Sequence, residues 1–354
     1  MKIKLAILDS DINYLKRLAT VFSTKYSDKV ELYSFTEMEG ALSALSSEKI
    51  DVFLSDEGFL VDAGRIPGRC GFAYFVGSVD VDSVNGQHAI CKFQKVDQIY
   101  KEILGIFSEC AGSISALKGG EGAAKVLVFS SPCGGTGTSS MAAASAKRYA
   151  QAGKRVLHLN LERFSTADVF FKGEGSFGMS DVVFAVKNKK ANLALKLESC
   201  VKCDPCGVYF YSPARIALER MELTQEEIND LISRVRNSGT YDVVVVDIDF
   251  AMTKEMLQLF GGAYRVVWVG DGSETSNEKM AAAHEALSVM EKGMETQFSN
   301  EICLIYNKFS NKTGKLVSCS QLKNIGGVPR LERATVAQVV EHLAGQKMLD
   351  DLLN

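Results

Sequence analysis

Short apolar segments alternate with amphipathic segments along almost the whole chain, and this alternation constrains the fold more than any other feature of the sequence. Short, strongly apolar segments indicate buried strands, and the segments between them have the periodicity of surface helices. Strands that alternate with helices are typical of parallel sheets covered on both faces. The sequence therefore predicts an α/β fold built from doubly wound sheets.

A glycine- and serine-containing stretch from Ala111 to Gly122 interrupts this alternation. It has no strong hydrophobic periodicity, and such a composition is typical of a linker. A chain of 354 residues is long enough for roughly two domains that each bury a core. We therefore expect a first domain at residues 1–112, a linker at residues 113–123 and a second domain at residues 124–354.

The first domain is expected to contain about five strand–helix units. Its predicted strands are Ile3–Leu8, Val30–Phe35, Val52–Ser55, Phe72–Val76 and Ala89–Phe93, and its predicted helices are Asn13–Phe22, Glu39–Ser46 and Val96–Phe107. In the second domain the predicted strands are Lys125–Phe129, Arg155–Leu161, Gly207–Tyr211, Asp242–Asp247, Tyr264–Val269 and Glu301–Tyr306, and the predicted helices include Ser139–Ala152, Thr224–Asn237, Ser276–Glu291 and Val336–Leu343.

The charge balance and hydropathy bear on partners and location. Lys and Arg number 40 and Asp and Glu number 43, which gives a formal net charge of −3. Such a balance produces no large positive field, so specific nucleic-acid binding is not expected. The sequence contains no apolar run of the roughly 18 residues that a membrane span requires, and its amino-terminal segment lacks the pattern of a secretion signal. We therefore expect a cytoplasmic protein.

Nine cysteines are scattered along the chain, and three of them are clustered. Cys200, Cys203 and Cys206 form two overlapping C-x-x-C spacings, which could hold zinc or an iron–sulfur cluster. No fourth ligand is visible nearby, so reduced cysteines in a loop are the simpler interpretation. None of the four histidines has a partner at ligand or catalytic spacing, and His158, in the middle of a predicted strand, is expected to be a core residue.

Residues 129–140, FSSPCGGTGTSS, carry the strongest functional signal in the sequence. They follow an apolar strand and open a helix rich in alanine. Three glycines, Gly134, Gly135 and Gly137, allow positive φ angles and let a ligand approach the backbone closely. The start of the helix directs free N–H groups and the positive end of the helix dipole at the same place. The segment predicts a phosphate-binding loop, with an ordinary glycine-rich strand–helix turn as the alternative.

The segment resembles the deviant Walker A loop of the MinD/ParA family of ATPases, K-G-G-x-G-K-S/T-S/T. The resemblance implies that the loop binds ATP and that Ser139 is a ligand of magnesium. The implied nucleotide-binding residues of the loop are Cys133, Gly134, Gly135, Thr136, Gly137, Thr138, Ser139 and Ser140. Both lysines of the pattern are replaced, the signature lysine by Cys133 and the P-loop lysine by Thr138. Since lysines there neutralise charge in the transition state, we expect ATP binding with slow or absent hydrolysis.

Three later strands fall in the order found in the same family. The strand that ends at Asp247 resembles a Walker B strand, which implies that Asp247 binds magnesium. Another resembles the strand that usually ends D-x-D, but here these positions are Asn160 and Glu162. Glu162 is therefore the candidate catalytic residue, and the loss of one carboxylate weakens the case for hydrolysis. The strand ending near Asn307 resembles the one whose asparagine reads adenine, because an amide both donates and accepts hydrogen bonds.

The first domain resembles a response-regulator receiver, a flavodoxin-like fold that gathers acids, a hydroxyl and a lysine at the carboxyl ends of its strands. Asp9, Asp56, Ser78 and Lys92 match these positions, with Lys92 placed inside the fifth predicted strand. The second acid of the usual pair is replaced by Ser10. Because magnesium binding and hence phosphorylation depend on that acid, we expect a degenerate receiver that acts through interactions.

A receiver-like domain joined to a MinD/ParA-like ATPase is similar to the TadZ/CpaE proteins, which help to localise and assemble the tight-adherence (Tad) pilus machinery at a bacterial cell pole. The resemblance implies an ATP-binding localisation factor that dimerises face to face across its nucleotides and contacts pilus or secretion proteins. Its motifs support the ATP-binding part, whereas the pilus assignment rests on the domain architecture alone.

Three alternatives belong to other functional classes. A phosphorylated receiver that gates a nucleotide-dependent switch would depend on Asp56. A DNA-partitioning ATPase would require a basic surface, which the net charge of −3 disfavours. A membrane-surface ATPase would require a basic amphipathic helix, but the carboxyl-terminal stretch Val336–Leu353 contains more acids than bases. We expect this stretch to pack on the second domain, so direct membrane contact is not expected.

Overall fold

A computed structural model describes residues 2–110, 122–188, 192–292, 298–319 and 321–354. The chain divides into two compact units, one of residues 1–117 and 188–200 and the other of residues 118–187 and 201–354. Residues 113–121 of the predicted linker lie outside the described residues. No helix in the described parts of the chain combines the length and the apolar character needed to cross a membrane.

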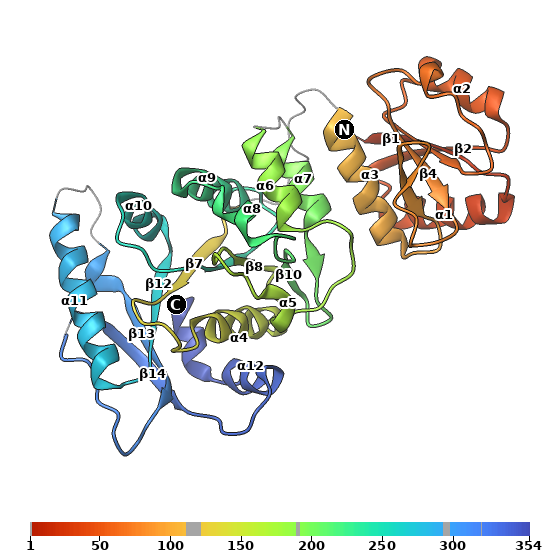
Figure 1. Ribbon diagram of the computed structural model, residues 1–354. Coiled ribbons are helices and arrows are strands. Elements are labelled where there is room, and N and C mark those ends of the chain that lie inside the picture. Colours follow the sequence, from red (N-terminus) through yellow and green to blue (C-terminus); the bar gives the residue numbers. More distant parts are fainter. Residues whose placement is uncertain (1, 111–121, 189–191, 293–297, 320) are drawn as a thin grey trace. The chain divides into compact units, whose positions relative to one another are not determined.

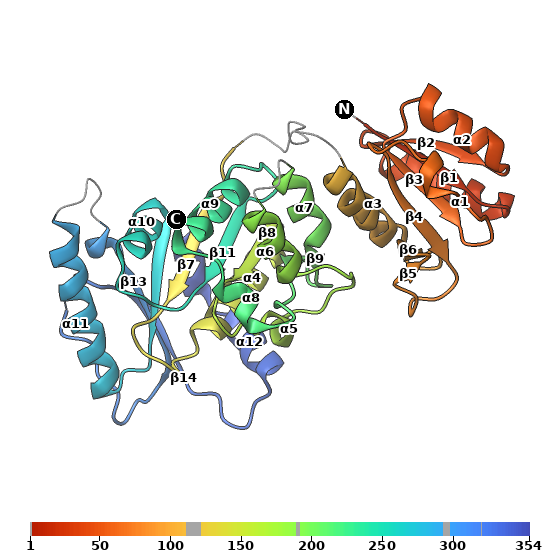
Figure 2. The same cartoon turned by 45° about the horizontal axis from the view of Figure 1, so that its top comes forward.

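The first unit contains a six-stranded sheet in the order β2-β1-β3-β4-β6-β5, whose strands are labelled across Figures 1 and 2. Its strands are β1 (Ile3–Leu8), β2 (Val30–Phe35), β3 (Val52–Asp56), β4 (Gly71–Val76), β5 (Ser83–Val84) and β6 (Gln87–Cys91), and its first three helices are α1 (Ile12–Lys25), α2 (Met38–Ser47) and α3 (Val96–Cys110). All neighbouring strands pair in parallel except β5, which is antiparallel to β6. Without β5, this is the strand order of flavodoxin-like folds, as predicted.

Two of the five predicted strand–helix units lack an α-helix, which corrects the sequence expectation. Between β3 and β4 the chain forms only a short 3-10 turn, Ala63–Arg65. Between β4 and β6 it forms a hairpin whose two turn residues, Asn85 and Gly86, have φ angles of +51° and +76°. Asn-Gly is the residue pair that favours such a two-residue turn, so the local sequence selects a hairpin over a helix.

A helix from the middle of the chain completes the core of the first unit. Helix α7 (Leu193–Cys200) follows the first strands of the second unit in sequence but belongs to the first unit. Its Leu195 is buried in the same hydrophobic cluster as the core residues of α3. An ion pair of 2.9 Å between Lys29 Nζ and Glu198 Oε1 joins α7 to the segment before β2. From the sequence, this segment was expected in the second domain, residues 124–354.

The second unit contains an eight-stranded sheet in the order β14-β13-β12-β7-β11-β8-β10-β9. Its strands are β7 (Lys125–Ser130), β8 (Val156–Asn160), β9 (Lys202–Cys203), β10 (Val208–Phe210), β11 (Val243–Asp247), β12 (Arg265–Gly270), β13 (Cys303–Phe309) and β14 (Lys323–Pro329). Neighbours pair in parallel except β9, which is antiparallel to β10. The two units thus confirm the predicted α/β class with parallel-dominated sheets.

Helices cover both faces of this second sheet. They are α4 (Thr138–Gln151), α5 (Ala167–Phe170), α6 (Met179–Lys187), α8 (Ala217–Met221), α9 (Gln225–Arg236), α10 (Lys254–Gly262), α11 (Glu274–Glu291) and α12 (Val336–Ala344). In Figures 1 and 2, α4 and α12 lie on one side of the sheet and α9 and α10 on the other. Strands β8 and β11 are buried along their whole length between these layers.

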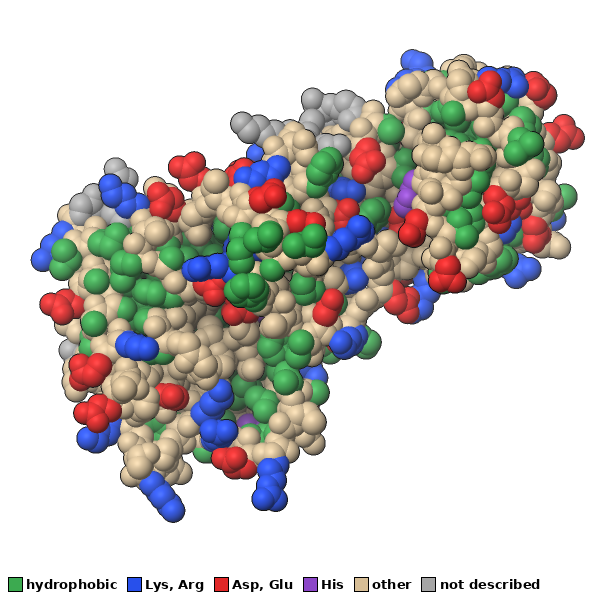
Figure 3. Space-filling model, viewed as in Figure 1, with side chains coloured by type: hydrophobic (Ala, Val, Ile, Leu, Met, Phe, Trp, Pro, Cys, Tyr) green, Lys and Arg blue, Asp and Glu red, His purple; other side chains and the backbone are tan. Residues whose placement is uncertain are grey.

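The carboxyl-terminal helix packs on the second unit, as the sequence predicted. Val340 and Leu343 of α12 are buried in the main hydrophobic cluster, together with Leu349 and Leu352 that follow it. The apolar face of the helix is therefore used inside the protein. Acidic and basic side chains are interspersed on the molecular face shown in Figure 3, without a large area of one sign.

Candidate functional site

The glycine-rich loop joins the end of β7 to the start of α4, as the sequence predicted. Gly135 and Gly137 have φ angles of +78° and +89°, a region that residues with a side chain rarely adopt. A Cβ atom added at Gly134 or Gly135 would meet no other atom within 4 Å. The backbone of both glycines therefore borders open space, which leaves room for a ligand to approach it.

The first turn of α4 leaves its N–H groups without a side-chain cap. Gly137 occupies the N-cap position in the left-handed conformation, and no side chain accepts a hydrogen bond there. The helix is 14 residues long, so its dipole places partial positive charge at this end. Free N–H groups beside an open glycine backbone form a favourable site for a phosphate group.

Asn307 fastens the loop from the end of β13. Its side chain is buried, and its amide nitrogen Nδ2 donates to the carbonyl oxygen of Thr136 over 2.8 Å. A Cβ atom at Gly137 would lie 2.4 Å from the same nitrogen. Gly137 is therefore required both for its φ angle and for the close approach of Asn307. The sequence resemblance implied that Asn307 reads adenine, and the structure shows that its Nδ2 holds the loop.

Cys133 stands where the related loops carry their signature lysine, and its side chain points into the protein. The thiol is buried and lies 3.3 Å from the carbonyl oxygen of Ser276, to which it donates. The backbone N–H of Cys133 donates to the hydroxyl of Ser131 over 3.1 Å. Thr138 stands at the position of the P-loop lysine, and its hydroxyl oxygen lies 3.3 Å from the hydroxyl oxygen of Thr136. Neither replaced position supplies a positive charge.

A buried acidic group lies at the carboxyl ends of β8 and β11. The amide nitrogen of Asn160 donates to Asp247 Oδ2 over 3.0 Å and to Glu162 Oε2 over 3.1 Å. Asp247 is 1% exposed, and its Oδ1 has no hydrogen-bond partner among the described residues. Burial and the nearby Glu162 carboxylate raise the pKa of Asp247 well above its usual value, although a hydrogen bond with Ser139 opposes the shift.

These residues fit a magnesium ion that is shared with a nucleotide. A cation would stabilise the buried Asp247 carboxylate, and oxygen ligands such as the Ser139 hydroxyl suit magnesium. No cluster of three or more His, Cys, Asp or Glu residues within the described ranges is arranged to hold a metal ion. Magnesium would therefore depend on phosphate oxygens and water for its remaining ligands. Among the described residues, Cys200, Cys203 and Cys206 likewise do not form a cluster that could hold a metal ion.

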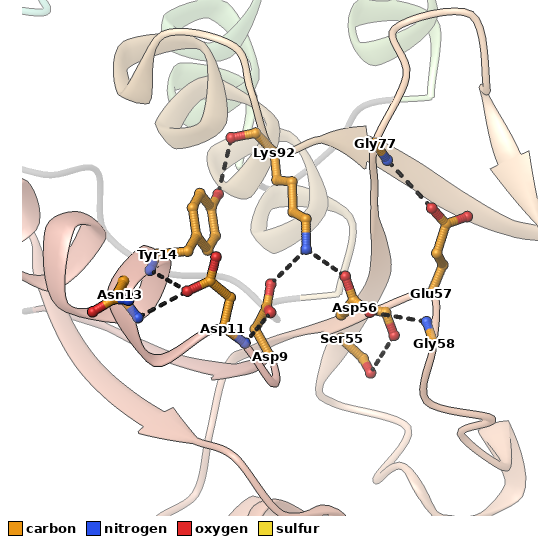
Figure 4. Close-up of polar contacts among 10 residues, drawn as sticks. All are labelled: Asp9, Asp11, Asn13, Tyr14, Ser55, Asp56, Glu57, Gly58, Gly77 and Lys92. Atoms are coloured by element: carbon orange, nitrogen blue, oxygen red, sulfur yellow. Dashed lines mark hydrogen bonds and ion pairs between the residues drawn. The ribbon is translucent and has the colours of Figure 1, made fainter.

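The receiver-like residues Asp9, Asp56 and Lys92 come together at the carboxyl edge of the first sheet (Figure 4). Lys92 Nζ lies 2.9 Å from Asp9 Oδ2 and 2.5 Å from Asp56 Oδ2. Burial lowers the pKa of Lys92, but its hydrogen bonds to Asp56 and Asp9 outweigh this effect and raise it. The lysine thus bridges both acids. Asp56 Oδ1 also accepts from the Gly58 N–H over 3.0 Å.

Two features of this site differ from the sequence expectation. Lys92 lies one residue beyond β6, which ends at Cys91, and not inside the strand. The strand is shifted toward the amino terminus because the Asn-Gly hairpin sets its start at Gln87. Ser78 is exposed, and its hydroxyl interacts with Asp80 in its own loop.

Asp11, which follows Ser10 at the position of the usual second acid, caps the start of helix α1. Asp11 is the N-cap of α1, and its Oδ1 accepts from the N–H groups of Asn13 and Tyr14 over 2.9 and 3.0 Å. These hydrogen bonds, the one from Tyr14 first, lower the pKa of Asp11. The carboxylate is thus engaged by the helix start, and Ser10 offers only a hydroxyl. The two acids of the cluster, Asp9 and Asp56, are both paired with the single internal lysine Lys92.

Residues 1–108 match the family model described as "TadZ-like, receiver domain". The first unit contains a TadZ-like receiver domain. A comparison with curated proteins finds no match.

A ParA family ATPase from Chlorobium tepidum TLS is 19% identical to this chain, covers 66% of it and 98% of its own length, and superposes with a TM-score of 0.50. The MinC:MinD cell division protein complex of Aquifex aeolicus gives 18% identity, coverages of 65% and 95%, and a TM-score of 0.47. The septum site-determining protein MinD of Pyrococcus horikoshii OT3, complexed with Mg-ADP, is 14% identical, covers 62% of this chain and 94% of its own length, and gives a TM-score of 0.47. At 19% identity the ParA family ATPase shows the fold alone, a ParA-type fold downstream of the TadZ-like domain.

Proposed function

We propose that this protein is an ATP-binding localisation and assembly factor for a Tad-type pilus or secretion machinery. The observation that carries the proposal is that a TadZ-like receiver domain and a ParA-type fold with an open glycine-rich loop occur in one chain. The receiver match points to the Tad system. The loop points to a nucleotide as the ligand.

ATP is the proposed ligand because the loop offers backbone donors to phosphate. The glycines at 134 and 135 border open space, and the first turn of α4 has no side-chain cap. In this proposal, residues from Cys133 to Ser140 form the phosphate site and Asn307 lies beside it. Magnesium is held by Ser139 and Asp247. Its positive charge favours the ionised form of the buried Asp247 carboxylate, whose pKa is otherwise raised.

Hydrolysis is proposed to be slow or absent. The two positions that carry lysine in the related loops are a buried thiol and a threonine. The remaining catalytic candidate is Glu162, which shares the Asn160 amide nitrogen with Asp247. A carboxylate held in this way is poorly placed to activate water without an added positive charge. ATP is therefore proposed to act as a stable ligand.

A homodimer across the nucleotide is the proposed assembly. Large apolar side chains are exposed in the segments that follow strands of the second sheet: Phe164 after β8, Ile216 and Leu218 at the start of α8 after β10, and Met252 after β11. The carboxyl ends of parallel strands share one edge of a sheet, which is also the edge of the glycine-rich loop. Apolar groups around a ligand loop suit a second copy of the chain that closes over the nucleotide.

Calorimetric titration with ATP and with ADP, in the presence of magnesium, tests the proposal while light scattering follows the mass. We expect saturable ATP binding in the micromolar range, an increase toward twice the monomer mass, and little phosphate release. A protein that binds neither nucleotide would refute the proposed ligand. Binding without a mass increase would refute only the dimer.

Localisation requires a separate experiment in cells. A fluorescent fusion in a bacterium that assembles Tad pili is expected to concentrate at a cell pole. A fusion with an altered loop distinguishes whether the nucleotide is needed for this placement. A uniform distribution of the unaltered fusion would contradict the localisation part of the proposal while leaving nucleotide binding intact.

A further inference from the structure

A lysine from outside the glycine-rich loop lies against it. The nitrogen Nζ of Lys308 donates to the carbonyl oxygen of Gly135 over 2.7 Å. The Cε atom of the same side chain would lie 3.7 Å from a Cβ atom added at Gly137. The loop therefore has an ammonium group beside its glycines although neither Cys133 nor Thr138 supplies one.

The backbone around Lys308 is specialised for this placement. Lys308 has a φ angle of +59°, which is uncommon for a residue with a side chain and is often found at functional sites. The pairing of β13 with β14 shifts register between Asn307 and Phe309, so Lys308 is an extra residue at a bulge. Bulges redirect side chains near sites, and here the bulge presents Asn307 and Lys308 to the same loop.

The positive charge of Lys308 is not neutralised by an acid in the described parts of the chain. None of the ion pairs found there includes Lys308, and its side chain is exposed. Its acceptor, the Gly135 carbonyl, is a neutral group. A phosphate oxygen forms a stronger, charge-assisted hydrogen bond with an ammonium group than a carbonyl does. The long lysine stem permits the exchange of one acceptor for the other.

We propose that Lys308 binds the terminal phosphates of the nucleotide and replaces the positive charge missing from positions 133 and 138. The inference rests on the proposed ATP-binding function. It assigns the phosphate contact to the carboxyl end of β13. On binding, the ammonium leaves the Gly135 carbonyl for a phosphate oxygen while Asn307 keeps the loop closed.

The test compares Lys308→Gln and Lys308→Arg with Lys312→Gln, a matched control that removes an exposed lysine from the turn after β13. Each full-length protein is titrated with ATP, ADP and adenosine in the presence of magnesium. Melting temperatures without nucleotide verify folding. We expect Lys308→Gln to raise the Kd for ATP by at least about tenfold, because a charged hydrogen bond is lost. Lys308→Arg and Lys312→Gln should stay within about threefold of the unaltered protein.

Adenosine separates a phosphate contact from a general effect on the loop. Its affinity is expected to be unchanged in Lys308→Gln, and the loss is expected to be larger for ATP than for ADP. Equal losses for all three ligands would show that Lys308 only fastens the loop, which overturns the proposal. Unchanged ATP affinity in Lys308→Gln would also overturn it and leave the ATP-binding function standing. If the unaltered protein binds no ATP, both the function and the role of Lys308 fail.

Discussion

Substitution of Gly134 separates ligand binding from folding better than any other change in the loop. A Cβ atom added at Gly134 would meet no other atom within 4 Å. The φ angle of Gly134 lies outside the left-handed range in which a side chain is strained. Gly134→Ala and Gly134→Val should therefore change the free energy of unfolding by no more than about 0.5 kcal/mol, as for a surface substitution. The added methyl groups occupy the space through which a phosphate would reach the backbone.

The expected loss of affinity follows from the hydrogen bonds that the side chain prevents. A hydrogen bond to a charged group is worth about 1.5–3 kcal/mol, so losing one or two such bonds costs about 1.5–6 kcal/mol. This corresponds to a Kd for ATP that is at least about tenfold higher. The loss should be larger for valine than for alanine, because valine fills more of the space.

Calorimetry gives the Kd of each variant, and thermal melting without nucleotide confirms that the fold is intact. Gly262→Ala is a matched control, because an added Cβ atom at Gly262 in α10 also meets nothing within 4 Å. It should bind ATP like the unaltered protein. If Gly134→Val binds ATP as tightly as the control, phosphate does not approach the loop at Gly134 and the reasoning is refuted.

Three further predictions concern a buried histidine, the receiver site and catalysis. His158 is fully buried, neither of its ring nitrogens has a hydrogen-bond partner among the residues that the structure describes, and burial lowers its pKa to about 3. Because the unfolded chain binds a proton near pH 6.5 and the folded chain does not, His158 should cost stability as the pH falls from 6.5 toward 3, by up to about 1.4 kcal/mol per pH unit. His158→Leu should flatten this part of the unfolding profile and raise stability at pH 7 by about 1 kcal/mol. Acetyl phosphate should not phosphorylate Asp56 detectably, whereas Ser10→Asp restores a second acid and should permit some labelling. Thr138→Lys should increase phosphate release from ATP, because it returns a cation to the helix start.

Each of these predictions has an outcome that contradicts it. An unchanged acid limb in His158→Leu would mean that other groups govern stability between pH 6.5 and 3. Labelling of the unaltered protein, lost in Asp56→Asn, would favour the signalling alternative in which a phosphorylated receiver gates the second unit. Rapid hydrolysis by the unaltered protein would show that the lysines are dispensable for turnover.

The sequence predicted elements well where apolar residues dominate a short segment. Strands β1 and β2 begin and end where they were expected, and β11 was expected from its run of valines. The position of the glycine-rich loop was predictable because its glycines lie between an apolar strand and a helix. These signals are local, so they do not depend on the rest of the fold.

Other features depend on tertiary contacts and could not be read from local patterns. Strand β14 was not predicted because Gly326 and Gly327 replace the apolar residues of a typical strand. Helix α7 has an ordinary helical sequence, and only the packing of Leu195 shows that it belongs to the first unit. Likewise, Lys308 follows Asn307 as an ordinary residue in the sequence, and the bulge of β13 is what brings it to the loop.

Equilibrium dialysis with labelled ATP and magnesium is the most direct test of whether the glycine-rich loop binds the triphosphate of ATP. At saturation we predict one ATP per chain for the unaltered protein, and almost none for Gly134→Val at the same concentrations. No retained label in the unaltered protein would contradict the account. Equal retention by both proteins would place the nucleotide elsewhere.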